Sequence, residues 1–182
     1  MGSDASIRFF EAQFQRQVEA HDLRPADVRR MTVTLSEPTY RMHGEMGFED
    51  KFRALLSTRW AAAVVLHDRA GWLDQFTPER LADPAVRAFA QDRIDVRSDP
   101  AMATTGASIE VERISDEPVS VHRAVPKGDA DDPLSEEEIV DKFRRAARGI
   151  VAENRSEEAL RMLLAIEELD SVDRLMAALR AT

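Results

Sequence analysis

The sequence predicts an α+β fold with two layers: a four-stranded, mainly antiparallel sheet with helices on one face, and further helices at the C-terminal end. Short segments alternate apolar and polar residues, which is typical of strands buried on one face only; they lie at residues 31–35, 94–96, 109–111 and 119–121. The longer stretches around them place apolar residues at helical spacing. A sheet with one apolar face requires helices over that face, which gives two layers.

The N-terminal part is predicted as helix, strand and loop. A helix over residues 7–18 follows from apolar residues three and four apart, namely Ile7, Phe10, Phe14 and Val18. It should end before Pro25, because proline disfavours helical backbone in the residue that precedes it. The strand at 31–35 closes at Glu37-Pro38, and residues 39–47, which include Gly44 and Gly47, are interpreted as a loop.

A long helix is predicted over residues 49–67, with an apolar stripe formed by Phe52, Leu55, Leu56, Ala63 and Leu66. Residues 60–66 are apolar on every side of this helix, and a helix without a polar face must be covered all round. A two-layer domain covers only one side. Either the helices of residues 135–182 wrap over this segment, or a second chain or domain does, and the second possibility predicts a partner.

The remaining elements follow from caps and turns. Thr77-Pro78 and Asp83-Pro84 are helix starts, each with a capping residue before a proline at the first helical position. Ser135 opens a capping box and a helix that is predicted to reach about residue 153. Two further helices are expected, capped at Ser156 and Asp170. Since no repeat or linker interrupts the chain, we expect a single domain over residues 1–182.

Composition excludes several classes of function. The 182 residues contain 34 acidic side chains against 25 lysines and arginines, so no broad basic face is available for nucleic acid. The longest apolar run has seven residues, whereas a membrane-spanning helix needs ~20. No cysteine is present, which removes disulfides and thiolate chemistry, and no apolar stretch follows Met1 as in a signal peptide. We therefore expect a cytoplasmic protein.

The common catalytic and metal-binding motifs are missing, so candidate residues rest on their local setting. His43, in the expected loop beside Gly44, is the candidate general base; otherwise it is an ordinary loop histidine. Arg59 places a charge inside an apolar stretch, where it meets an anionic ligand or a structural carboxylate. Trp60 either lines a pocket or belongs to the core, and Lys127 either meets a substrate carboxylate or is solvated.

Several ordered segments resemble the C-terminal domain of the MmgE/PrpD family. They are residues 51–66, 71–77 and 81–87, the Pro126-Lys127-Gly128-Asp129 segment, and residues 133–138 and 142–144. The family includes 2-methylcitrate dehydratase, cis-aconitate decarboxylase and iminodisuccinate epimerase. The resemblance runs from about residue 7 onward. It implies a small α+β domain, similar in architecture to chorismate mutase, in a chain without the family's large helical N-terminal domain.

Two departures from the family's pattern bear on activity. The family's lysine-containing stretch ahead of the first helix has no counterpart in residues 1–6, and the tyrosine that the family often carries on the buried helix falls at Trp60. An indole keeps an N–H donor but cannot titrate as a phenol does. The resemblance also implies that the catalytic histidines lie largely in the helical domain, in a cleft between the two domains.

Three functions follow from these observations. The first is the small subunit of a lyase or isomerase that acts on a carboxylate-bearing small molecule without metal or organic cofactor, and that needs a helical MmgE/PrpD subunit or self-association to complete its site. His43, Arg59 and Lys127 would contact the substrate, with Trp60 lining the wall. The second is a repurposed homodimer of a specialised biosynthetic pathway that binds an apolar intermediate near Trp60. The third is a decayed fragment kept for assembly or regulation.

Overall fold

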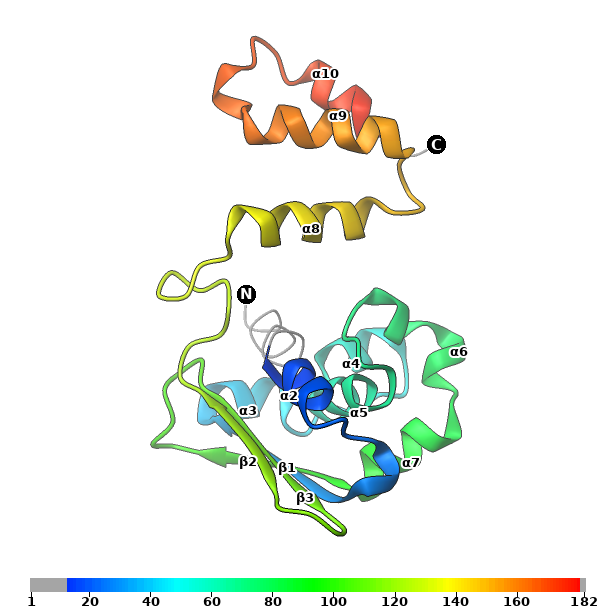
Figure 1. Cartoon of the computed structure of the whole chain (residues 1–182), viewed down its shortest axis with the longest axis vertical. Coiled ribbons are helices and arrows are strands. Elements are labelled where there is room, and N and C mark those ends of the chain that lie inside the picture. The colour runs from blue at the N-terminus through cyan, green and yellow to red at the C-terminus, as the bar shows by residue number, and fades with distance from the viewer. Residues whose placement is uncertain (1–12, 181–182) are drawn as a thin grey trace. The chain divides into compact units, whose positions relative to one another are not determined.

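The computed structural model describes residues 13–180 and divides the chain into two compact units, Met1–Asp132 and Pro133–Thr182. The first unit contains the sheet and the larger apolar core, and the second contains helices only (Figure 1). The prediction of an α+β fold is confirmed. The prediction of one domain over residues 1–182 stays a prediction, and residues 7–12 of the first expected helix lie outside the described residues.

The sheet has four strands in the order β2-β1-β3-β4. Antiparallel pairing joins β1 (Val28–Ser36) to β3 (Ala107–Arg113) and β3 to β4 (Val119–Arg123). The expectation that the strand at 94–96 is antiparallel was wrong: β2 (Ile94–Asp99) runs parallel to β1, with Val33 opposite Val96. The reason is the helical connection between β1 and β2, which returns the chain to the starting end of the sheet, as parallel neighbours require.

The helices of the first unit gather on one face of the sheet (Figure 1). They are α2 (Gln15–Ala20), α3 (Glu37–His43), α4 (Lys51–Leu56), α5 (Thr58–Asp68), α6 (Pro78–Leu81) and α7 (Pro84–Asp92), with single 3₁₀ turns η2 (Pro25–Asp27) and η3 (Leu73–Phe76). In β1 the alternating residues Met31, Val33 and Leu35 are fully buried, and residues between them are more exposed. The two predicted layers follow from this alternation.

The apolar segment of α5 is covered by its own unit. Each residue from Trp60 to Leu66 is at most 6% exposed, and β2, α2, α4 and α7 all contact the helix. Both explanations offered for its apolar surface, helices of residues 135–182 or a second chain, were therefore wrong, because the sheet and three neighbouring helices already enclose it. The burial of α5 gives no argument for a partner.

Two other local expectations need correction. Residues 39–47 were interpreted as a loop, but Glu37–His43 form α3, in which Pro38 occupies the first turn, where proline is tolerated. The helix expected over residues 49–67 is two helices, because Ser57 adopts an extended backbone and its side chain caps α5 by accepting from the N–H of Trp60. Phe52 lies outside the apolar stripe and is 71% exposed.

The second unit consists of α8 (Glu136–Ala147), α9 (Glu153–Leu164), the 3₁₀ turn η4 (Ile166–Glu168) and α10 (Asp173–Ala178). The predicted capping box is confirmed: Ser135 accepts from the N–H of Glu138, whose carboxylate accepts from the N–H of Ser135. The helix ends earlier than predicted, ahead of Gly149, whose φ of 76° lies in the left-handed region.

The expected caps of the next two helices were wrong. Ser156 lies inside α9 and its hydroxyl donates to the carbonyl of Glu153, while α10 begins at Asp173 rather than after Asp170. Ala159, Leu175 and Ala178 form the buried centre of this unit. None of the helices in the described part of the chain is both long and apolar enough to cross a membrane.

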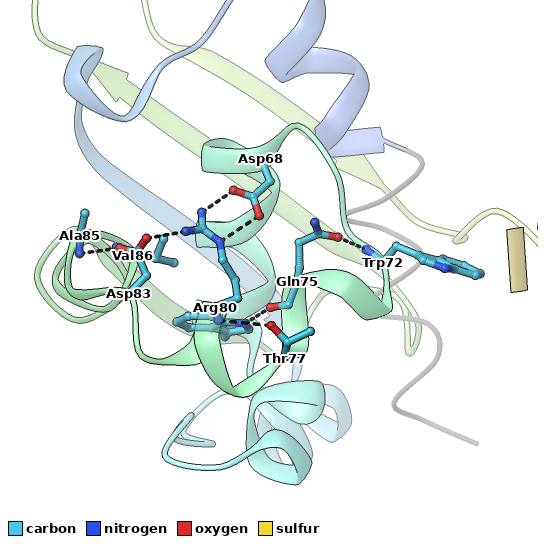
Figure 2. A network of polar contacts seen from close by, with 9 residues as sticks. Asp68, Trp72, Gln75, Thr77, Arg80, Asp83, Ala85 and Val86 are labelled. Atoms are coloured by element: carbon cyan, nitrogen blue, oxygen red, sulfur yellow. Dashed lines mark hydrogen bonds and ion pairs between the residues drawn. The ribbon is translucent and has the colours of Figure 1, made fainter. Parts of the chain in front are cut away.

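A network of charged and polar groups holds the segment that follows α5 (Figure 2). The guanidinium of Arg80 donates to both carboxylate oxygens of Asp68, at the end of α5, and to Asp83 with an Nη1–Oδ2 distance of 2.6 Å. Asp83 in turn accepts from the N–H groups of Ala85 and Val86 and so caps α7. Arg80 therefore fixes the start of α7 relative to the end of α5.

Replacing Arg80 should test this network. Arg80→Ala leaves the carboxylates of Asp68 and Asp83, which are largely shielded from solvent, without their shared cation. We expect the free energy of unfolding to fall by about 2 kcal/mol, the magnitude typical of hydrogen bonds to charged groups. Urea denaturation measures this, with Arg29→Ala, an exposed arginine on β1, as the control. Equal stabilities for the two variants would contradict the assigned role.

The cap of α7 predicts a dependence of stability on pH. The N–H of Val86 first, and then the N–H of Ala85 and the charge of Arg80, hold the pKa of Asp83 below its ordinary value. A carboxylate whose pKa is lowered by folding stabilises the protein above its unfolded pKa, and this stabilisation is lost as the pH falls through the folded pKa.

Asp83→Asn keeps a capping side chain but removes the titration. Between about pH 5 and pH 2 the wild type should therefore lose more stability than Asp83→Asn. Urea denaturation at a series of pH values measures the difference, with Glu117→Gln in the exposed β3–β4 turn as a control that keeps the wild-type slope. Parallel curves for the wild type and Asp83→Asn would contradict the prediction.

Candidate functional site

A cavity of about 220 Å³ lies where the α3–α4 loop meets α5 and α7. The loop contributes Met46, Gly47, Phe48 and Glu49, and the helices contribute Arg59, Arg87 and Gln91. Arg87 and Gln91 are four residues apart on α7, so both project from one face of that helix. The cavity thus combines two guanidinium groups, a carboxamide, a carboxylate and an aromatic ring.

Hydrogen bonds at the start of α5 hold the loop in place. The hydroxyl of Ser57 donates to the carbonyl of Met46 at 2.8 Å, and Nδ1 of His43 contacts the carbonyl of Leu56 at 3.1 Å. Asp50 caps α4 by accepting from the N–H of Arg53. Because these contacts link both ends of the loop to the helices, residues 46–49 have a defined position against α5.

The two arginines that line the cavity have no ion-pair partner among the described residues. Nε of Arg59 donates to the carbonyl of Ile94 at 3.2 Å, and Nη1 of Arg87 donates to the carbonyl of Leu81 at 3.1 Å. Each guanidinium has five N–H donors, so these single contacts leave most of its donors for a ligand. Two partly buried cations facing one cavity favour an anionic ligand.

Glu49 is the one carboxylate among the described residues of the cavity wall, and it accepts a hydrogen bond from Nη1 of Arg53 at 3.2 Å. A backbone N–H bond and the Arg53 guanidinium hold the pKa of Glu49 below its ordinary value, so it is ionised near neutral pH and is a weak base. Within residues 13–180, no three histidine, aspartate or glutamate side chains cluster as metal ligands. The described walls of the cavity are thus suited to binding more than to proton transfer.

A pair of aromatic rings supports the cavity wall at Phe48. The ring of Phe48 packs against the indole of Trp60 with 5.4 Å between ring centroids, and Cζ of Arg87 lies over the Phe48 ring, 5.2 Å from its centroid. Trp60 is fully buried and its Nε1 donates to the carbonyl of Gln75 at 3.1 Å. Trp60 therefore supports the wall from behind Phe48.

The four residues predicted from the sequence have different positions. Arg59 lines the cavity, Trp60 lies one layer behind it, and His43 ends α3 with 2% exposure, in a helix and not in the expected loop. Lys127 lies between β4 and α8, pairs with Asp132 at 3.2 Å and is not among the described residues of the cavity wall. The substrate-contacting and catalytic roles of these residues stay predictions.

Sequence reasoning missed Phe48, Arg87 and Gln91. A signal was present for the last two, because an arginine and a glutamine four residues apart follow the Asp83-Pro84 helix start and must share a helix face. No sequence signal places Arg87 beside Arg59, since that depends on the packing of α7 against α5.

Comparison with known proteins identifies the family of the chain. Residues 12–168 match the model of the MmgE/PrpD C-terminal domain, so the chain belongs to the MmgE/PrpD family. The match extends through α8 and α9 of the second unit and ends before α10.

A curated relative, the cis-aconitate decarboxylase-like protein oryM of Aspergillus oryzae, is 31% identical over 157 residues. That alignment covers 83% of this chain and 32% of the relative. The chain therefore spans about a third of the length of the relative that it matches.

Proposed function

We propose that the cavity binds a carboxylate of a small-molecule substrate for a lyase or isomerase of the MmgE/PrpD type. The observation that carries the proposal is the presence of two guanidinium groups, Arg59 and Arg87, on one cavity with no carboxylate paired to either among the described residues. Guanidinium binds carboxylate through two parallel hydrogen bonds, which fixes the orientation of the substrate as well as its charge. Gln91 supplies a further amide donor.

The reaction that we propose is proton abstraction next to a carboxylate, followed by departure of hydroxide as water or by re-protonation of the same carbon. In a decarboxylase of this class, CO₂ leaves and a proton is added to the carbon skeleton that keeps its electron pair. The reaction is proposed to need no metal and no organic cofactor. Family membership supports this class, and the relative from Aspergillus oryzae is named for similarity to a cis-aconitate decarboxylase. The proposed location is the cytoplasm, as the absence of cysteine suggests.

Such a reaction needs a base that the described cavity wall does not supply, because Glu49 is paired to Arg53 and is a weak base. We therefore propose that a second component completes the site: a helical MmgE/PrpD N-terminal-type subunit, with self-association as the other arrangement. The family match is to a C-terminal domain, which supports this proposal. The full burial of Trp60 gives no support to an apolar ligand bound against its indole.

Removing one arginine should weaken carboxylate binding. Arg59→Ala is expected to raise the Kd for cis-aconitate about tenfold or more, the magnitude of one charge-assisted hydrogen bond. Isothermal titration calorimetry at low ionic strength measures the Kd, and circular dichroism checks that the variant is folded. Arg16→Ala, an exposed arginine on α2, is the matched control and should leave the Kd unchanged. Unchanged affinity in Arg59→Ala would remove Arg59 from the site.

The need for a helical subunit, the first of these two arrangements, predicts the activity of the isolated chain. We expect no dehydration of 2-methylcitrate and no decarboxylation of cis-aconitate by the purified chain, and turnover when a helical MmgE/PrpD N-terminal-type subunit from the same genome is added. Assays that follow substrate loss by chromatography measure both reactions. Arg59→Ala in the reconstituted mixture should lower turnover, which shows that the reaction uses this cavity. Full activity of the isolated chain would overturn the requirement for a helical subunit.

A further inference from the structure

We infer that Phe48 is a positioning residue for the anion site: its ring, which contacts both Trp60 and Arg87, holds the guanidinium of Arg87 in place for the ligand. This inference rests on the proposed function, since it concerns the same cavity. Phe48 is 6% exposed and lines the cavity, yet its side chain has no hydrogen-bond donor for an anion. Its effect on binding must therefore act through the cation that it contacts.

The contacts of Arg87 explain why it needs such a support. Its side chain has several rotatable bonds, and ordering a free arginine on ligand binding has a large entropy cost. One hydrogen bond, to the carbonyl of Leu81, holds the Nη1 end, and a cation–π contact holds Cζ over the Phe48 ring, 5.2 Å from its centroid. With both contacts the cation is in place before the anion arrives, and the remaining N–H groups are the donors available to it.

The position of the ring is in turn fixed by the core. Trp60 contacts Phe48 at 5.4 Å between centroids with an angle of 32° between the rings. Trp60 has no exposed surface, and its indole N–H is anchored to the carbonyl of Gln75. Contacts thus lead from the buried core of the unit, through Trp60 and Phe48, to the guanidinium of Arg87 at the cavity.

The test compares variants at Phe48 and Arg87 in the full chain, with cis-aconitate as the probe and calorimetry as the readout. Phe48→Leu removes the aromatic face while keeping an apolar side chain, and the Kd should rise about five- to tenfold, within the range of a cation–π contact. Phe48→Tyr keeps the ring and should stay within about twofold of the wild type. Arg87→Ala should weaken binding at least as much as Phe48→Leu does.

The double variant separates positioning from a general structural defect. If Phe48 acts through Arg87, the combined Phe48→Leu and Arg87→Ala variant binds no more weakly than Arg87→Ala alone. Additive losses would show that Phe48 acts on the fold as a whole and would overturn the inference. Thermal unfolding verifies that each variant is folded, and Phe48→Met, which is also apolar and flexible, replaces Phe48→Leu in the same comparison if that variant unfolds.

The binding measurements distinguish a failure of the positioning role of Phe48 from a failure of the anion site. Wild-type affinity in Phe48→Leu together with weakened binding in Arg59→Ala and Arg87→Ala overturns the positioning role and leaves the anion site intact. Wild-type affinity in both arginine variants, or no binding of the probe by the wild type, overturns the anion site and the positioning role with it.

Discussion

The burial of α5 on all sides is the constraint on which the first unit depends. A helix whose residues 60–66 are entirely apolar has to be enclosed, and the chain achieves this with β2 on one side and α2, α4 and α7 around the rest. Burial of apolar area provides the driving force, roughly 25 cal/mol for each Å² removed from water. The charged network of Arg80, Asp68 and Asp83 then fixes how the chain leaves α5 and enters α7.

The candidate site follows from the way α5 begins. Its first turn carries Arg59, which cannot enter the core with Trp60 and instead reaches the edge of the packing, where it contacts the carbonyl of Ile94. Ser57, which caps that turn, anchors the α3–α4 loop, and α7 brings Arg87 to the same cavity. A positively charged cavity thus arises at the margin of an apolar core, where charged side chains are partly shielded from water and an anion binds more strongly than on an open surface.

Several parts of the structure that depend on local chemistry could be predicted from the sequence, although the caps expected at Ser156 and Asp170 were wrong. Thr77, Asp83 and Ser135 cap the helices that they were expected to cap, and the alternation around Val33 marks the central strand. The parts that depend on distant contacts could not. The parallel direction of β2 is set by the route of the whole helical connection.

Single residues also show that contacts between distant parts of the chain cannot be predicted from local sequence. Gly44 suggested a loop, yet its backbone is helical, and a side chain is excluded there because a Cβ atom would lie 2.2 Å from the ring of Tyr40. The candidate site could be predicted only in part. Arg59 is recognisable in the sequence as a charge in an apolar run, whereas the role of Arg87 depends on its contact with Phe48, which is distant in the sequence.

The order of the strands has a consequence for synthesis of the protein. In the finished sheet β1 is central, with Met31 opposite Ile94 on one side and Val111 on the other. A ribosome releases β1 long before either neighbour exists, so both of its hydrogen-bonding edges are open during translation of the intervening helices. Unpaired apolar strands are templates for aggregation. The nascent chain is therefore most exposed to misassembly, and most in need of chaperones, until about residue 113 has emerged.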